Sequence, residues 1–221
     1  MEKTDNDRAG DTVLIGPNRL EGFLGIPENA RGLVIFAHGA GSSRFSTRNN
    51  LVAATLRSKG LATLLFDLLS EREAADRRNV FDVALLSERL IEAMHWVRAQ
   101  GTIRHLPIGL FGSSTGAAAA LAAAARMPEQ VIAVVSRGGR PDLAGPALGA
   151  VRCPTLLIVG GADIQVLQLN EEALQAMSCE KRLAIVPGAT HLFEEKGALE
   201  TVAEDAAVFF SDHLGPAEGR R

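Results

Sequence analysis

The sequence predicts an α/β domain built on a doubly wound, mostly parallel sheet of about eight strands, with helices on both faces. Three observations lead to this prediction. The 221 residues are enough for one sizeable core and fit one domain better than two. The apolar runs do not alternate with polar residues, as expected of strands that are covered on both faces. Helix-like stretches separate these runs, and repeated β-α units build sheets of this kind.

The chain opens with a pattern that predicts an antiparallel hairpin. Short strands are expected at 12–15 and 19–26, and Gly16, Pro17 and Asn18 supply the turn between them. The domain is expected to span 12–214. Residues 1–11 and 215–221 are expected to form flexible ends.

Six strands and five helices are then expected in alternation. The strands are predicted at 32–37, 62–67, 108–111, 131–136, 155–159 and 182–186. The helices are predicted at 48–58, 80–98, 115–126, 165–177 and 198–213. Gly60, Gly101 and Pro128 mark helix ends, because these residue types stop helices. Ligands of such sheets bind beyond the carboxyl ends of the strands, so functional residues are expected there.

Composition narrows the class of partners. The net charge of −3 argues against nucleic acid, which needs a basic surface. Cys153 and Cys179 have neither a metal-ligand spacing nor a disulfide framework, which indicates a reducing compartment. The polar first ten residues do not resemble a signal peptide, and the longest apolar stretch, 116–125, is too short for a bilayer. We therefore expect a cytoplasmic protein without membrane, metal or cofactor, and the oligomeric state stays open, a homodimer included.

One motif follows the strand expected at 108–111. Residues 112–116 read GSSTG, which is G-x-S-x-G between a strand and a helix. Such a sharp turn places its central residue in a strained conformation, and the glycines let neighbouring backbone pass closely. The sequence therefore predicts Ser114 as a nucleophile, against the alternative of a glycine-rich turn with a solvated serine.

A serine nucleophile needs a base, and five histidines are available. His191 lies in the loop between the last expected strand and the last helix, from which it can reach Ser114 across the sheet edge. His38 follows the strand at 32–37 and is expected to shape its loop. Thus His191 is the predicted base.

The histidine in turn needs a carboxylate to hold its ring. Asp163 ends the strand and glycine turn at 155–163, and the chain order Ser114, Asp163, His191 is the order found in α/β hydrolases. Asp142, which follows the strand at 131–136, is the rival acid. Asp163 could instead cap the next helix, a common role for aspartate.

Backbone N–H groups are expected to stabilise the oxyanion of an acyl transfer. The N–H of Thr115 follows the nucleophile directly, and the N–H of Ala40 lies in the loop after the strand at 32–37. Both are predicted oxyanion-hole donors.

Two charged stretches bear on the substrate. Arg137 and Arg140 follow the strand at 131–136 and are candidates for binding a substrate carboxylate or phosphate, since guanidinium matches such groups bidentately. Ion pairs with nearby acids are the alternative. The stretch 69–78 carries charges of both signs and is expected to be a solvated mobile loop. Little sequence between 141 and 153 is available for a large lid, so an open site for small substrates is expected.

These residues resemble the α/β-hydrolase superfamily from about Thr12 to His213, and within it the small dienelactone-hydrolase-like group. The similar segments are HGAGSS at 38–43, GSSTG at 112–116, LLIVGGAD at 156–163 and GATHLF at 188–193. Dienelactone hydrolases proper have a cysteine nucleophile, whereas this chain has Ser114. Similar hydrolase domains are also joined to phosphoribosyltransferase domains, but no such second domain is expected within these residues.

The resemblance implies a carboxylesterase-like serine hydrolase that needs no cofactor and acts on a small acyl substrate. Dienelactone-type lactone hydrolysis and acyl transfer with the same residues are alternatives. A non-catalytic binding module with a hydrolase fold is the alternative from another class.

Overall fold

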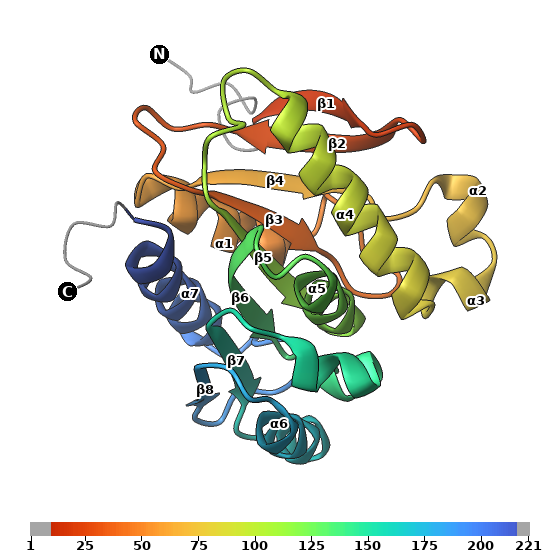
Figure 1. Ribbon diagram of the computed structural model, residues 1–221. Coiled ribbons are helices and arrows are strands. Elements are labelled where there is room, and N and C mark those ends of the chain that lie inside the picture. The colour runs from red at the N-terminus through yellow and green to blue at the C-terminus, as the bar shows by residue number, and fades with distance from the viewer. Residues whose placement is uncertain (1–9, 216–221) are drawn as a thin grey trace.

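The computed structural model of the chain describes residues 10–215 and confirms the predicted fold class. Its eight strands form one sheet in the order β1-β2-β4-β3-β5-β6-β7-β8 (Figure 1). The hairpin strands β1 and β2 are antiparallel, and so are β2 and β4, whereas the other neighbouring strands are parallel. The strands are β1 (Asp11–Ile15), β2 (Leu20–Gly25), β3 (Leu33–Ala37), β4 (Ala62–Phe66), β5 (Ile108–Ser113), β6 (Val131–Arg137), β7 (Thr155–Gly160) and β8 (Lys181–Val186).

Helices cover both faces of this sheet and enclose two apolar cores (Figure 1). One core lies under α4, α5 and α6, and the other lies under α1 and α7. The helices are α1 (Thr47–Ser58), α2 (Glu71–Ala74), α3 (Arg77–Val80), α4 (Val83–Ala99), α5 (Thr115–Arg126), α6 (Ile164–Ala176) and α7 (Ala198–Leu214). A 3₁₀ segment, η2 (Pro141–Ala150), joins β6 to β7. Within residues 10–215, no helix combines the length and the apolar character that a bilayer crossing requires.

The expected flexible ends fall largely outside the described residues. Residues 1–9 and 216–221 are not among those that the structure describes. Asp11, expected to belong to the flexible end, instead pairs with Leu24 in the hairpin. Strand pairing therefore begins one residue earlier than the apolar pattern indicates.

The charged stretch after β4 contains two short helices, α2 and α3, where the sequence suggests a loop. Ser70 begins α2 with a reciprocal pair of hydrogen bonds to Glu73, which satisfies the free N–H groups at the start of a helix. The Glu73 carboxylate also accepts a hydrogen bond of 2.6 Å from Arg89 of α4. The long helix then begins at Val83, later than expected, because Asp82 accepts a hydrogen bond from the N–H of Leu85. Side-chain hydrogen bonds at the starts of the helices, which a hydropathy pattern does not reveal, thus determine where the helices of this segment begin.

Candidate active site

Ser114 sits at the sharp turn between β5 and α5. Its backbone has φ 50° and ψ −123°, a conformation that side chains rarely adopt and that costs about 1–3 kcal/mol. The turn requires both of its glycines: a Cβ on Gly112 would lie 2.4 Å from the Cα of Ala117, and one on Gly116 would lie 2.2 Å from the carbonyl oxygen of Ala37. The predicted tight elbow is therefore present, and its strain points to a functional role for the serine.

His191 and Asp163 meet at the same edge of the sheet. The Nδ1 of His191 lies 2.8 Å from Oδ2 of Asp163, and because a carboxylate only accepts, the ring nitrogen donates. The His191 side chain is 40% exposed and that of Asp163 is 16% exposed, so the ring reaches solvent while the carboxylate is sheltered. Asp163 precedes α6 but makes no side-chain cap there. The geometry thus matches the predicted pairing.

Asp142, the rival acid, is bound to a different partner. Its two carboxylate oxygens accept hydrogen bonds of 2.9 and 2.8 Å from the guanidinium of Arg140. This bidentate ion pair also raises the pKa of Arg140, mainly through the hydrogen bond. Of the two candidates, only Asp163 is hydrogen-bonded to His191.

The end of β6 and the loop that follows it contact both Ser114 and His191. The N–H of Ser114 donates to the carbonyl of Arg137 at 3.2 Å, and the N–H of Arg140 donates to the carbonyl of Ser114 at 3.0 Å. Between these two residues, Gly138 lies against His191: a Cβ on it would be 3.2 Å from the His191 carbonyl oxygen and 3.7 Å from Cε1. One short loop therefore contacts both residues.

The two expected oxyanion-hole residues also lie together. The N–H of Ala40 donates to Oγ1 of Thr115 at 2.9 Å, which joins the loop after β3 to the first turn of α5. The N–H of Thr115 occupies the first position of α5, where helix geometry supplies no intrahelical acceptor. The Ala40 N–H is therefore close to the elbow and has an internal acceptor.

His38 shapes its loop, as expected. Its Nδ1 lies 3.0 Å from the carbonyl oxygen of Gly39, and the N–H of Leu68 donates to its Nε2 at 3.1 Å. Both ring nitrogens are thus used by backbone, which ties the loop after β3 to the loop after β4. Burial lowers the pKa of His38, so the neutral ring is favoured.

The two candidate substrate-binding arginines differ in surroundings. Arg140 is bound by Asp142, which is the ion pair that the sequence left open as an alternative. Arg137 is buried, and its Nη2 lies 3.5 Å from Oδ1 of Asn49 on α1. Neither arginine was distinguishable from the other in the sequence.

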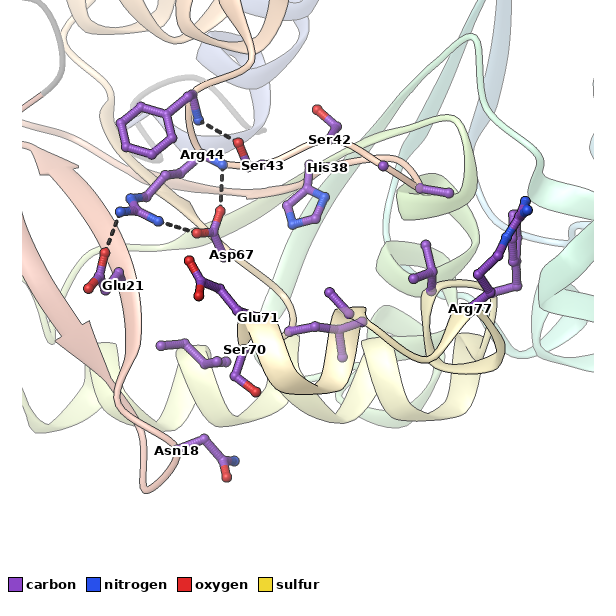
Figure 2. A pocket seen from close by; sticks show the side chains of 18 of the residues that line it. Asn18, Glu21, His38, Ser42, Ser43, Arg44, Asp67, Ser70, Glu71 and Arg77 are labelled. Atoms are coloured by element: carbon purple, nitrogen blue, oxygen red, sulfur yellow. Dashed lines mark hydrogen bonds and ion pairs between the residues drawn. The ribbon is translucent and has the colours of Figure 1, made fainter.

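A pocket of about 850 Å³ lies beside the loop after β3 (Figure 2). Its lining comes from the turn between β1 and β2 with the start of β2, from the loop after β3, and from the segment that contains α2 and α3. Ala40 and His38 line the pocket on the side of the elbow. Its apolar lining includes Leu20, Phe45, Leu69, Ala74, Val80 and Phe81.

The sequence did not predict the ion-pair cluster at this pocket. Arg44 pairs with Glu21 and with Asp67, and its guanidinium lies 4.3 Å from the ring centre of Phe45 (Figure 2). Asp67 directly follows β4, so the rule that functional groups follow strands could have drawn attention to it. No sequence signal links Arg44 to Glu21.

Among residues 10–215, no group of three or more His, Cys, Asp or Glu side chains is arranged to hold a metal ion.

Comparisons with known proteins identify the family and the fold of the chain. A sequence family described as an alpha/beta hydrolase domain matches residues 30–208. A crystal structure of dienelactone hydrolase from Anabaena variabilis is 52% identical, with a TM-score of 0.89 over 93% of this chain and 97% of that chain. Est1E from Butyrivibrio proteoclasticus, at 15% identity, shares the fold with a TM-score of 0.77 over 93% of this chain and 99% of that chain.

Two curated relatives are named for a different activity. Proteins from two strains of Mycobacterium tuberculosis, named as phosphoribosyl transferases, are 56% identical over 205 residues, or 92% of this chain. The aligned region is 46% of each of those proteins, so this chain spans about half of their length.

Proposed function

Because the chain belongs to the α/β-hydrolase domain family and is dienelactone-hydrolase-like, we propose that it is a serine hydrolase that cleaves a carboxylic ester or a related acyl bond of a small substrate. The observation that carries this proposal is the hydrogen bond of 2.8 Å between His191 and Asp163, at the edge where Ser114 is held in a strained elbow. A nucleophile, a base and an acid that orients the base are the parts that acyl transfer needs.

Acylation begins when Oγ of Ser114 attacks the ester carbonyl while Nε2 of His191 takes the hydroxyl proton. Asp163 keeps the Nδ1 proton of His191 in place and stabilises the imidazolium that forms. The tetrahedral oxyanion accepts hydrogen bonds from the N–H groups of Thr115 and Ala40, replacing the Thr115 hydroxyl at the latter. The C–O bond then breaks, and His191 gives its proton to the leaving alcohol.

Deacylation repeats these steps with water as the nucleophile. His191 takes a proton from water, the hydroxide attacks the acyl carbon, and the bond to Ser114 breaks as its oxygen regains the proton. The pocket beside Ala40 receives one side of the substrate, and its size of about 850 Å³ admits a drug-sized group.

A second candidate is the hydrolysis of a lactone. The 52% identity to a dienelactone hydrolase favours it, and the same residues would open a cyclic ester without releasing an alcohol. A matched screen of p-nitrophenyl esters and simple lactones separates the two candidates by their kcat/KM values.

The name of the Mycobacterium relatives does not transfer directly to this chain. Because the aligned half matches a hydrolase family, we assign the phosphoribosyl transfer of that name to the part of those proteins that this chain does not cover.

The experiment that tests the proposal is turnover of p-nitrophenyl butyrate by wild type, Ser114→Ala and Ser113→Ala. Ser114→Ala should lose roughly 10⁴-fold or more of kcat, since loss of the nucleophile disables the whole set. Ser113 is the matched control, because it neighbours Ser114 but its hydroxyl lies 3.5 Å from the buried carbonyl of Ala37. Retained turnover in Ser114→Ala, or an equal loss in Ser113→Ala, would refute the assignment.

A further inference from the structure

Arg137 is a buried cation with unused hydrogen-bond donors. It is 8% exposed, and its Nε and Nη1 have no hydrogen-bond partner among the described residues. Burial, assisted by the charge of Arg48, lowers the pKa of Arg137 to about 10, so the group remains charged at neutral pH. A buried cation without an acidic partner is costly, and Arg137 has no ion pair among residues 10–215.

The surroundings of Arg137 add positive potential. Its Nη2 lies 3.5 Å from Asn49, in the first turn of the 12-residue helix α1, whose N-terminal end carries a partial positive charge. Arg48, in the same turn, contributes a second guanidinium. The acid that pairs with Arg48, at 3.3 Å, is Glu194, whose side chain is 68% exposed. This basic cluster of Arg137, Arg48 and the first turn of α1 therefore favours an anion.

The cluster also lies next to the proposed catalytic residues. The Arg137 carbonyl accepts the N–H of Ser114 at 3.2 Å, and its Cα pairs with that of Ser113 in the sheet. On the other side, its guanidinium lies 6.0 Å from the ring centre of Phe193, two residues after His191. A group bound at the cluster thus lies within the span of one small substrate.

We propose that the basic cluster binds an oxyanion group, a carboxylate or a phosphate, that the substrate carries apart from its scissile bond. This inference deepens the proposed function and rests on it. Arg137 is chosen over Arg140 because Asp142 already neutralises Arg140. Arg48 and Glu194 form the movable side of the cluster, since both reach solvent and ion pairs of this kind are weak.

The test compares two esters of similar length, mono-p-nitrophenyl succinate and p-nitrophenyl valerate, on three proteins. Wild type should favour the charged ester. Arg137→Met keeps an unbranched apolar stem but removes the guanidinium, and it should lower the ratio of the two kcat/KM values by about tenfold or more, as expected for a charged hydrogen bond. Arg140→Met, the matched substitution three residues further along the chain, should keep the wild-type ratio.

The source of the anion is resolved by inhibition with succinate and with inorganic phosphate. The anion that resembles the natural group should compete with p-nitrophenyl valerate in wild type and lose that effect in Arg137→Met. The proposal is overturned if wild type shows neither a preference for the charged ester nor competition by either anion. A folded Arg137→Met that keeps the wild-type behaviour overturns it as well.

Two further measurements keep this test independent of the hydrolase proposal and of folding. If no ester is cleaved, the hydrolase proposal fails alone, and the cluster is tested by whether succinate or phosphate raises the Tm of wild type but not of Arg137→Met. If Arg137→Met does not fold, Arg48→Gln replaces it, and a smaller loss of the same preference or of the same Tm rise is expected. No change in Arg48→Gln would then count against the cluster.

Discussion

The two halves of the carboxyl edge of the sheet are built differently. Around Ser114, Asp163 and His191, short glycine-containing turns follow β5, β7 and β8, and backbone hydrogen bonds or close contacts fix each position. Around the pocket, the walls are longer segments held by side chains. Arg44 lies between Glu21 and Asp67 (Figure 2), and Arg89 pairs with Glu73. The first half is specified by local sequence, whereas the second depends on partners that are distant in the chain. The proposed chemistry can therefore be inferred more readily than the substrate.

The largest expected effect is a loss of kcat when Asp163, the hydrogen-bond partner of His191, is replaced. Asp163→Asn should lower kcat by roughly 10⁴-fold, because an amide at this position favours the wrong tautomer of His191. Asp142→Asn is the matched control, since Asp142 binds Arg140 instead, and it should change kcat far less. Steady-state kinetics with p-nitrophenyl butyrate measures both, and equal losses in the two variants would show that Asp163 has no special role.

A smaller effect is expected when the backbone beneath His191 is displaced. A Cβ on Gly160 would lie 2.3 Å from the carbonyl oxygen of Ala189 and would push the loop that carries His191. Gly160→Ala should lower kcat/KM by about 100-fold, the usual cost of misplacing a reacting group by an ångström.

Gly188→Ala is the control for this substitution. Gly188 has φ +71°, but apart from its chain neighbours no atom lies within 4 Å of its Cβ position, so the change should cost about 1–2 kcal/mol of stability with little loss of activity. Urea unfolding of both variants measures the cost of backbone strain in stability, and their kcat/KM values measure the effect of displacing the His191 loop. If Gly160→Ala kept wild-type kcat/KM, the tight fit of this turn would have no bearing on catalysis.

On the pocket side, the expected effects are on binding. Phe81 lines the pocket and is 52% exposed. Phe81→Ala should raise KM for p-nitrophenyl hexanoate by about fivefold, which corresponds to roughly 1 kcal/mol of lost apolar contact, and should leave p-nitrophenyl acetate unchanged. Equal changes for the two esters would mean that the pocket does not hold the longer chain.

The smallest expected effect is a pH dependence of stability from His38. Its pKa in the folded protein lies below the ordinary value of 6.5, mainly because of burial, so below that pH the unfolded chain takes up a proton that the folded chain refuses. Stability therefore falls as the pH drops below about 6.5, and His38→Gln should lessen this fall. Tm values of both proteins between about pH 8 and pH 5.5 measure it, and parallel curves would exclude His38 as the source.

The order of the elements could be predicted from the sequence because the six strands after the hairpin are mainly apolar runs that end in turn residues. The same regularity placed Ser114, Asp163 and His191 at strand ends on one edge, and the structure pairs the latter two. The sequence kept Asp142 as a rival acid, and the two were separated by their partners in the structure: Asp163 is hydrogen-bonded to His191, and Asp142 pairs with Arg140.

Features that depend on distant side chains could not be predicted. Arg137 and Arg140 lie in one short segment and look equivalent in the sequence, yet one is buried beside α1 and the other forms an ion pair. The same holds for the charged stretch after β4, where contacts of Ser70 and Arg89 with Glu73 accompany two short helices in place of the expected loop. Hydropathy records burial along the chain but does not identify partners across it.

The assignment of Ser114 as the nucleophile is tested most directly by locating a covalent adduct on the protein. Wild type is treated with a fluorophosphonate probe, digested, and analysed by tandem mass spectrometry beside Ser114→Ala. We expect a single stoichiometric adduct on Ser114, absent from Ser114→Ala and formed much more slowly in Asp163→Asn. An adduct on another residue, or equal labelling of Ser114→Ala, would contradict the assignment of Ser114 as the nucleophile.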